Sequence, residues 1–374
     1  MTRSLASLAV NRCLHIGPDD TVTITFNEHF IRLAEDLAIE CFKDGADVLL
    51  NEYTDRFYLG YLTHLTKESL REPSIWCREL TRNSTAQFWL GAIFDPGAFR
   101  RIRPEKLAAD AEGEDNAHSS LRKEGKVRML LIDLGKVTRP RAKAYGLNHR
   151  ELQRMMSAAS CVDPNSLRKK GKEVAAKLQG SDEVHITSPN GTDLQLSVKG
   201  HRAIVNDAII DEQDMRQGAL RASIPDGSVE IAVVENSANG KVVLDVPTPM
   251  ADDLFLPTPW VGRMIRELSW TFHDGRVTCF EGDKNAEALR KEWETSSGDK
   301  DRIATLSVGL NQRAKLGFLV NRIVEGAVGI AIGGNMHLGG VNRPGFSYMG
   351  SIARATLEVE GTVLVENGKL KLRH

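Results

Sequence analysis

The sequence predicts an α/β protein of two domains, an N-terminal parallel-sheet α/β domain and a C-terminal mixed α+β domain. Its 374 residues exceed what one compact core usually holds, so two domains are expected. Residues 1–179 repeat the order strand, helix, strand, which is typical of βαβ units around a parallel sheet. Residues 180–374 contain many short alternating strands, and we place the domain boundary at this change of pattern near Gly180.

In the first domain, the predicted strands are separated by helical stretches. Val22–Phe26 alternates like a strand, and Ile31–Phe42 has the spacing of an amphipathic helix. Further strands are expected at Val48–Asn51, Ala86–Ile93 and Val127–Leu134. Neither a G-x-G-x-x-G nor a G-x-x-x-x-G-K-[ST] motif follows any of these strands, so a Rossmann-type nucleotide site is not expected.

A long helical stretch, His149–Leu178, closes the first domain. Its basic cluster Arg168–Lys172 is either a phosphate-binding patch or a solvated helix face, and we favour the latter. In the second domain, the Asn-Gly pair beginning at Asn190 and the Asp-Gly pair beginning at Asp274 favour tight hairpins. A helix is expected at Asn285–Thr295.

Composition and charge exclude several classes of function. Lys and Arg number 49 against 50 Asp and Glu, a formal net charge of -1, so we expect no nucleic-acid partner and no anionic membrane surface. The chain begins without a signal-peptide pattern and has no apolar run near the roughly 18 residues that span a bilayer. Its five cysteines are scattered and form no CxxC, which favours free thiols and a cytoplasmic location.

Six segments carry a resemblance to a known family, and they run in order over nearly the whole chain. They are RPRAKAYGLNHRELQRMM (Arg139–Met156), GTDLQLSVKG (Gly191–Gly200), IPDGSVEIAVVENSANG (Ile224–Gly240), DGRVTCF (Asp274–Phe280), IATLSVGLN (Ile303–Asn311) and GAVGIAIGGNMHLGGVNR (Gly326–Arg343). In these segments the sequence resembles the thermophilic leucyl aminopeptidases (aminopeptidase T type), a metallopeptidase family, and their relatives the 2,5-dihydroxypyridine 5,6-dioxygenases. The resemblance implies that fold and a homodimer.

The resemblance also implies a divalent metal site, but the matching positions carry other residues here. The family's P-x-G-E-V motif has a ligand Glu where this chain has Ser228. Its I-A-E-L-G-I-G-x-N motif has Glu where this chain has Thr305, and its G-T-x-H motif has His where this chain has Gly329. The last His and Asp of the family fall on Ser347 and Met349.

These substitutions remove every ligand that the family supplies, and the Tyr that follows its third motif is replaced by Met336. A divalent ion that activates water or O₂ needs three or more positions filled by His or carboxylate. Ser, Thr, Gly and Met provide neither group. We therefore expect that the ancestral metal site is lost and that the protein uses no cofactor.

A relocated metal site is the alternative. Glu230 lies two residues after Ser228, so on a strand it faces the same side, and His337 lies in the turn between the third and fourth motifs. Glu235 and His201 are further candidates. Each also has an ordinary interpretation, as an exposed strand residue, a turn residue bonded to backbone, or a surface group.

What remains of the site is a cleft floor rich in glycine and small polar groups, enlarged by the missing side chain at Gly329. Arg343 can hold a carboxylate in a bidentate manner, and Tyr348 offers a flat apolar face with a polar tip. A tight turn at Arg343–Gly345 is an equally good interpretation. We select His337, Thr305 and Tyr348 as candidate catalytic residues. The candidate ligand-binding residues are Arg343, Asn342, Asn335, Asn311 and Ser347.

The leading functional hypothesis is a metal-free descendant of this scaffold, a pseudoenzyme or an enzyme limited to acid–base chemistry. It binds a peptide or a small amphipathic or aromatic acid, as an accessory protein of a biosynthetic pathway. The alternative is an active metalloenzyme, an aminopeptidase or ring-cleaving dioxygenase, with a rearranged site. A purely structural or partner-binding protein is the third class.

Overall fold

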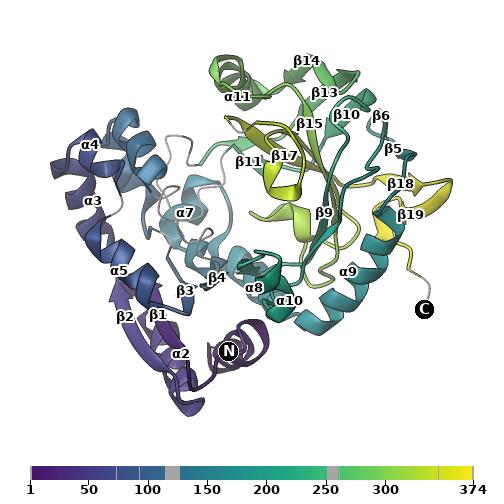
Figure 1. The fold of residues 1–374 in the computed structure, drawn as a ribbon. Coiled ribbons are helices and arrows are strands. Elements are labelled where there is room, and N and C mark those ends of the chain that lie inside the picture. Colours follow the sequence, from purple (N-terminus) through teal and green to yellow (C-terminus); the bar gives the residue numbers. More distant parts are fainter. Residues whose placement is uncertain are drawn as a thin grey trace. The chain divides into compact units, whose positions relative to one another are not determined.

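In the computed structural model the chain forms two compact units (Figure 1). The structure describes residues 2–72, 74–91, 93–113, 127–250, 260, 262–343 and 345–372. Unit 1 comprises Met1–Cys161, Ala208–Pro225 and Asp252–Gly262, and unit 2 comprises Val162–Asp207, Asp226–Ala251 and Arg263–His374. The chain passes between the units several times, which differs from a single boundary near Gly180.

Unit 1 is built on a five-stranded parallel sheet of order β2-β1-β3-β4-β8. The strands are β1 (Thr21–Phe26), β2 (Asp47–Glu52), β3 (Ala86–Trp89), β4 (Arg128–Ile132) and β8 (Arg221–Ile224). Thr21 pairs with Asp47 on one side of β1, and Val22 pairs with Ala86 on the other. The predicted parallel α/β domain is confirmed.

The core of unit 1 lies between this sheet and the N-terminal helices. Helix α2 turns Leu33, Leu37 and Cys41 inward, and they join Ile24 of β1 and Phe88 of β3 in one hydrophobic cluster. Helices of unit 1 include α1 (Thr2–Leu8), α2 (Ile31–Lys43), α3 (Asp55–His64), α4 (Lys67–Leu70), α5 (Ile75–Asn83), α7 (Arg139–Ala144), α8 (His149–Ser160) and α10 (Glu212–Arg216), and residues 104–113 are also helical.

The helical stretch predicted at residues 149–178 is two helices. Helix α8 ends at Ser160, and α9 (Pro164–Leu178), which belongs to unit 2, starts at a proline. Proline fits the first turn of a helix but not its interior, and Asp163 caps the new helix by accepting the N–H of Asn165 at 3.2 Å. Within the described ranges, every helix falls short of the length and apolar character that a bilayer crossing requires.

Unit 2 contains an eight-stranded and a five-stranded sheet whose pairings are antiparallel, which confirms the predicted mixed domain. The eight-stranded sheet has the order β14 (Arg276–Gly282), β13 (Leu268–His273), β10 (Asn239–Leu244), β6 (Thr192–Leu196), β5 (Val184–Ser188), β18 (Thr356–Val359), β19 (Thr362–Glu366), β20 (Lys369–Leu370). The five-stranded sheet has the order β17 (Ser347–Ile352), β16 (Val328–Gly333), β15 (Ile303–Gly309), β9 (Ser228–Ala232), β7 (Ile204–Asn206). A short ladder, β11 (Thr248–Pro249) with β12 (Met264–Ile265), and helix α11 (Lys284–Thr295) complete the unit.

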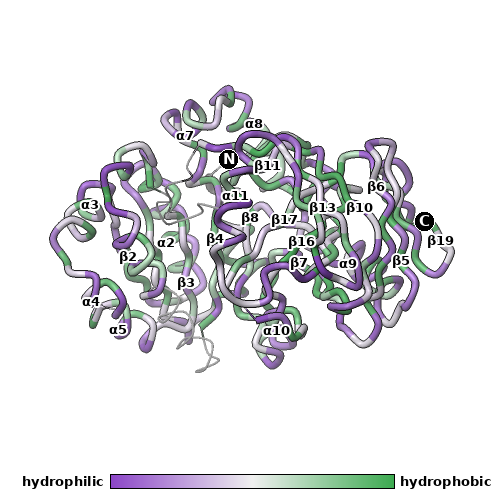
Figure 2. The backbone as a smooth tube through the Cα atoms, turned by 90° about the horizontal axis from the view of Figure 1, so that it is seen from above, coloured by the Kyte–Doolittle hydropathy of each residue, from purple (hydrophilic) through white to green (hydrophobic). Residues whose placement is uncertain are grey.

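Both predicted hairpins are present. Asp274 and Gly275 link β13 to β14 with φ values of 47° and 75°, as a tight two-residue hairpin requires. Asn190 and Gly191 link β5 to β6, and Gly191 has a φ of 96°. In Figure 2, strands β10 and β13 run side by side with hydrophobic stretches, as expected for neighbours inside a packed sheet.

One face of the five-stranded sheet packs against the eight-stranded sheet. Tyr348 of β17 meets Trp270 of β13 edge to face, with ring centroids 6.4 Å apart. Gly350 of β17 approaches Leu244 of β10 so closely that a Cβ there would lie 2.5 Å from the leucine Cδ1. This face is the core of unit 2, so the functional chemistry must be sought on the other face.

Candidate functional site

The opposite face of the five-stranded sheet carries small and polar side chains in rows across the strands. Residues directly opposite each other in an antiparallel pair share a face. One row is Glu230, Ser307, Gly329 and Ser351, and the next is Ala232, Thr305, Ala331 and Met349. We call the following set the polar face: Ser228, Glu230, Thr305, Ser307, Gly329, Ser347, Met349 and Ser351.

The five positions that the motifs match to metal ligands all lie on the polar face. Ser228 is on β9, Thr305 on β15, Gly329 on β16, and Ser347 and Met349 on β17. The register brings together positions that are far apart in the sequence, from Ser228 to Met349. The matched positions of four separate motifs therefore lie on one face of the sheet.

The five matched positions do not fit a divalent cation. Hydroxyls and a thioether supply no anionic ligand and no imidazole. The oxygen of Ser228 is already engaged, because Asn206 Nδ2 donates to it at 3.1 Å, and the Ser228 side chain is buried. Within the part of the chain that the structure describes, no three His, Cys, Asp or Glu side chains gather so that they could hold a metal ion.

The expectation that Gly329 enlarges the site is wrong. A Cβ at Gly329 would lie 3.3 Å from Met349 Sδ and 3.2 Å from Ser307 Cβ. Methionine is unbranched and fills irregular gaps, so its side chain takes up the space next to the glycine. A side chain at this position would require Ser307 or Met349 to shift.

The residues of the relocated-site alternative form no metal-binding group among the described residues. Glu230 does face the same side as Ser228, but Arg322 Nε pairs with its carboxylate at 3.2 Å. His337 lies in the exposed turn Met336–Leu338, outside the sheet. Glu235 fixes a loop instead: it accepts the backbone N–H of Val341 at 2.8 Å.

The ionisation of Glu235 reflects this structural use. Partial burial opposes its charge, but the N–H groups of Val341 and Asn335 outweigh burial and lower the pKa of the carboxyl group. A carboxylate held by donors in this way stabilises a loop.

Three buried asparagines from the predicted ligand-binding set bond to the backbone. Asn342 Nδ2 donates to the carbonyls of Ile303 and Gly333, at 2.9 Å each. Asn335 Oδ1 accepts the N–H of Asn342 at 2.9 Å, and Asn311 Nδ2 donates to the carbonyl of Asp226 at 2.8 Å. These amides fix the loops at the ends of β15 and β16.

The remaining predicted residues divide between the two faces. Tyr348 lies on the core face, where burial raises the pKa of its phenol and its hydroxyl donates to the Pro249 carbonyl at 3.3 Å. Ser347 is exposed at the start of β17, on the polar face. Arg343 is exposed, and its backbone N–H donates to Asp299 Oδ2 at 2.8 Å. Pro344, the middle of the predicted turn, lies outside the described residues.

Sequence reasoning missed Ser307, which is the most unusual group of the polar face. Its side chain is completely buried, and its Oγ has no hydrogen-bond partner among the described residues. Buried hydroxyls are nearly always paired, so an unpaired one requires an explanation. The signal was available, because Ser307 lies two residues after Thr305 on the same strand and must face the same side.

Ser307→Ala is expected to leave the free energy of unfolding unchanged or raise it by up to about 3 kcal/mol, because no hydrogen bond is lost and a buried unpaired hydroxyl is removed. Thr192→Val is the matched control, since Thr192 Oγ1 accepts the N–H of Val243 at 2.9 Å. Losing this hydrogen bond should lower the free energy of unfolding by about 1–3 kcal/mol. Urea unfolding of both variants measures the difference. Equal destabilisation by the two substitutions would mean that Ser307 has a structural partner.

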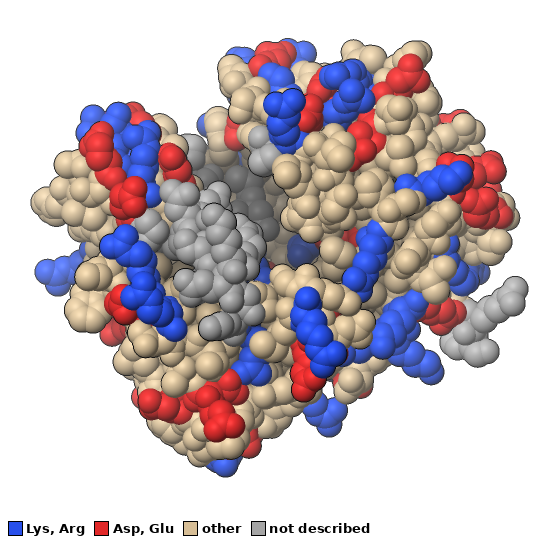
Figure 3. Space-filling model, viewed as in Figure 1, with Lys and Arg blue, Asp and Glu red and all other residues tan. Residues whose placement is uncertain are grey.

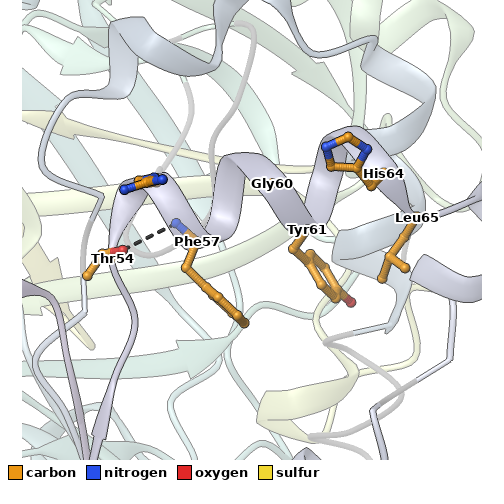
Figure 4. Close-up of a pocket in the computed structure, with 7 residues that line it drawn as sticks. Thr54, Phe57, Gly60, Tyr61, His64 and Leu65 are labelled. Carbon is orange, nitrogen blue, oxygen red and sulfur yellow. Dashed lines mark hydrogen bonds between the residues drawn. The ribbon is translucent and has the colours of Figure 1, made fainter.

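A concave place lies in unit 1, beside helix α3. Figure 4 shows Phe57 and Tyr61 pointing to the same side of the helix, with Gly60 between them. The hollow measures about 530 Å³ and is lined by Thr54, Arg56, Phe57, Gly60, Tyr61, His64 and Leu65. None of the predicted site residues lies there. On the face shown in Figure 3, acidic and basic side chains are interspersed.

Comparison with known proteins identifies the scaffold. The family described as thermophilic metalloprotease (M29) matches residues 1–302. The solved structure of wild-type AmpT from Thermus thermophilus is similar with a TM-score of 0.74 and 16% identity, over 99% of each chain. That of 2,5-dihydroxypyridine dioxygenase from Pseudomonas putida KT2440 is similar with a TM-score of 0.64 and 14% identity, over 100% of this chain and 97% of that one. A search of curated proteins finds no match.

At these identities the solved structures show the fold alone. The family match ends at residue 302, immediately before β15, whereas both structural similarities continue through β15, β16 and β17. The resemblance inferred from the six motifs is confirmed. Since the match covers well over half of the 374 residues, the chain belongs to the thermophilic metalloprotease (M29) family.

Proposed function

We propose that this chain is a metal-free member of its family that binds a peptide or a small amphipathic or aromatic acid on the polar face. The observation that carries the proposal is the convergence of all five matched ligand positions on one surface without a single carboxylate or imidazole among them. Binding without metal chemistry is the function that such a surface retains.

The polar face has the groups that a small polar ligand needs. Gly329 and Ala331 form a low floor in the middle of the sheet, and Thr305 and Ser307 supply hydroxyls that donate and accept. Leaving the Ser307 hydroxyl buried and unpaired costs about 1–3 kcal/mol, which a ligand that bonds to it would recover. The flexible Met349 side chain is the group that would move to admit the ligand.

Charged groups at the margin favour a ligand that carries a carboxylate or an ammonium group. Glu230 lies in the same row as Ser307 and pairs with Arg322, and each of these two residues can instead hold an opposite charge on a ligand. The exposed Arg343 and His337 are the predicted residues that remain accessible for such contacts. In this proposal the buried asparagines shape the loops and Tyr348 supports the sheet from its core side.

Metal analysis is the decisive test. Protein offered Zn, Mn and Fe and then freed of excess should retain far less than one equivalent of any of them, because no suitable ligand set is present on the polar face. Glu230→Ala and His337→Ala should leave this low content unchanged. A stoichiometric metal that is lost in either variant, with an activity abolished by a chelator, would establish the rearranged metalloenzyme instead.

A further inference from the structure

The hollow beside helix α3 belongs to unit 1, and its described lining includes no residue of the polar face. Its volume of about 530 Å³ lies within the range of roughly 300–1,000 Å³ that is typical of small-molecule sites. Phe57 and Tyr61 are four residues apart on α3 and point to the same side of the helix (Figure 4). A ligand that entered the hollow would therefore meet two aromatic side chains.

Both aromatic side chains are supported by a further ring. The rings of Phe57 and Tyr53 meet edge to face, with centroids 5.3 Å apart. The ring of Tyr61 lies 6.1 Å from that of Tyr58, which is 2% exposed and donates a hydrogen bond to the buried Asp110. Side chains that are fixed before a ligand arrives lose less conformational freedom on binding, which favours affinity.

Gly60 leaves the floor between the two rings open. It lies inside α3, and a Cβ at this position would meet no packing neighbour within 4 Å. Packing therefore does not require glycine here, although glycine inside a helix is less favourable than alanine. The missing side chain lets a flat ligand approach the helix backbone between Phe57 and Tyr61.

The charged groups that line the hollow are basic. Arg56 and His64 line it, and no Asp or Glu is among its described lining residues. Within the described ranges, the Arg56 guanidinium forms no ion pair. The neighbouring Asp55 is engaged elsewhere, because its carboxylate accepts the N–H groups of Phe94 and Asp95 at 2.8 Å each. This arrangement favours a ligand that carries a negative charge.

We propose that the hollow beside α3 is a ligand site separate from the polar face, and that it takes an aromatic ring bearing an anionic group, a carboxylate or a phosphate. The ring lies over Gly60 between Phe57 and Tyr61, where offset and edge-to-face contacts stabilise it. Arg56 holds the anion, since a guanidinium pairs with a carboxylate or a phosphate in a bidentate manner. The site does not depend on what the polar face binds.

Isothermal titration of the full chain with phenylacetate and with phenyl phosphate tests the ligand class. At least one of these two probes should bind, and the tighter one identifies the anionic group. Benzyl alcohol lacks the anion and cyclohexylacetate lacks the aromatic ring, so each should bind at least fivefold more weakly. Failure of both aromatic anions to bind would overturn the proposal, as would equal binding of either comparison compound.

Substitutions in α3 test where the tighter probe binds. Phe57→Ala and Arg56→Gln should each weaken it at least fivefold and keep the circular dichroism of the parent, because both side chains are exposed. Phe42→Ala in α2 is the matched control: Phe42 is 58% exposed, against 59% for Phe57, and does not line the hollow. Its binding should equal that of the parent, and equal weakening by Phe42→Ala and Phe57→Ala would overturn the placement.

Gly60→Ala separates a ligand site from a merely structural helix surface. Alanine favours the helix, so the urea midpoint of unfolding should rise, whereas the added methyl group should weaken the probe at least threefold. Unchanged binding would show that no ring lies over Gly60. A probe that is weakened by Thr305→Val and not by Phe57→Ala would lie on the polar face, which would overturn this inference and support the function proposed above.

Discussion

Gly329→His is expected to destabilise the protein by about 2–3 kcal/mol and to bind no metal, although it restores the residue that the family has at this position. The Cβ alone would lie 3.2 Å from Ser307 Cβ and 3.3 Å from Met349 Sδ, and the ring would extend beyond it. Its nitrogens would also need hydrogen-bond partners in a buried site. Urea unfolding measures the loss in free energy of unfolding, and elemental analysis measures the metal content.

The cause can be isolated with a second substitution. The double variant Gly329→His, Met349→Ala lacks the thioether that competes for the space. Its loss of unfolding free energy should therefore be smaller than the summed losses of the two single variants. Gly60→His in α3 is the matched control, because a Cβ there meets no atom within 4 Å, and it should not destabilise the helix. Full stability of Gly329→His alone would mean that the polar face retains room for a ligand side chain.

The sequence predicted the scaffold well where local pattern and burial agree. The spacing of Leu33, Leu37 and Cys41 marks the buried side of α2, and the observed helix Ile31–Lys43 extends the predicted one by a single residue. Helices α3, α4 and α5 were not predicted, and they are short, with 10, 4 and 9 residues. Their boundaries depend on capping: the side chains of Thr54, Thr66 and Ser74 accept N–H groups of the first turns.

The candidate site was predictable in part, because motif spacing gives positions but not faces. Ser347, Tyr348 and Met349 are consecutive, so alternation along a strand must separate Tyr348 from its neighbours. Which side is the core depends on the packing of β17 against Trp270 of a distant strand, and no local pattern contains that information. The same limitation concealed Met349 as the residue that fills the space beside Gly329.

The second large effect is expected at Asp110, a buried carboxyl group in the helical segment 104–113 of unit 1. Burial raises its pKa to about 6, although the Tyr58 hydroxyl donates a hydrogen bond to it, which opposes the rise. The ordinary value is 3.8, so the folded state binds the proton more tightly than the unfolded state does. The stability contributed by that proton is complete below about pH 4 and is lost as the pH rises through 6.

Asp110→Asn should therefore raise the free energy of unfolding by up to about 3 kcal/mol at pH 8, since a shift of about two pKa units is worth that much, and should change it little at pH 4. Asparagine keeps an acceptor oxygen for Tyr58 and carries no charge at any pH. Urea unfolding of parent and variant between pH 4 and 8 measures the effect. Glu112→Gln removes an exposed carboxylate two residues away that pairs with Arg71, and its difference from the parent should stay small throughout this range. A constant difference between Asp110→Asn and the parent at every pH would show that the buried carboxyl group does not titrate in this range, and the burial of Asp110 against Tyr58 would then require revision.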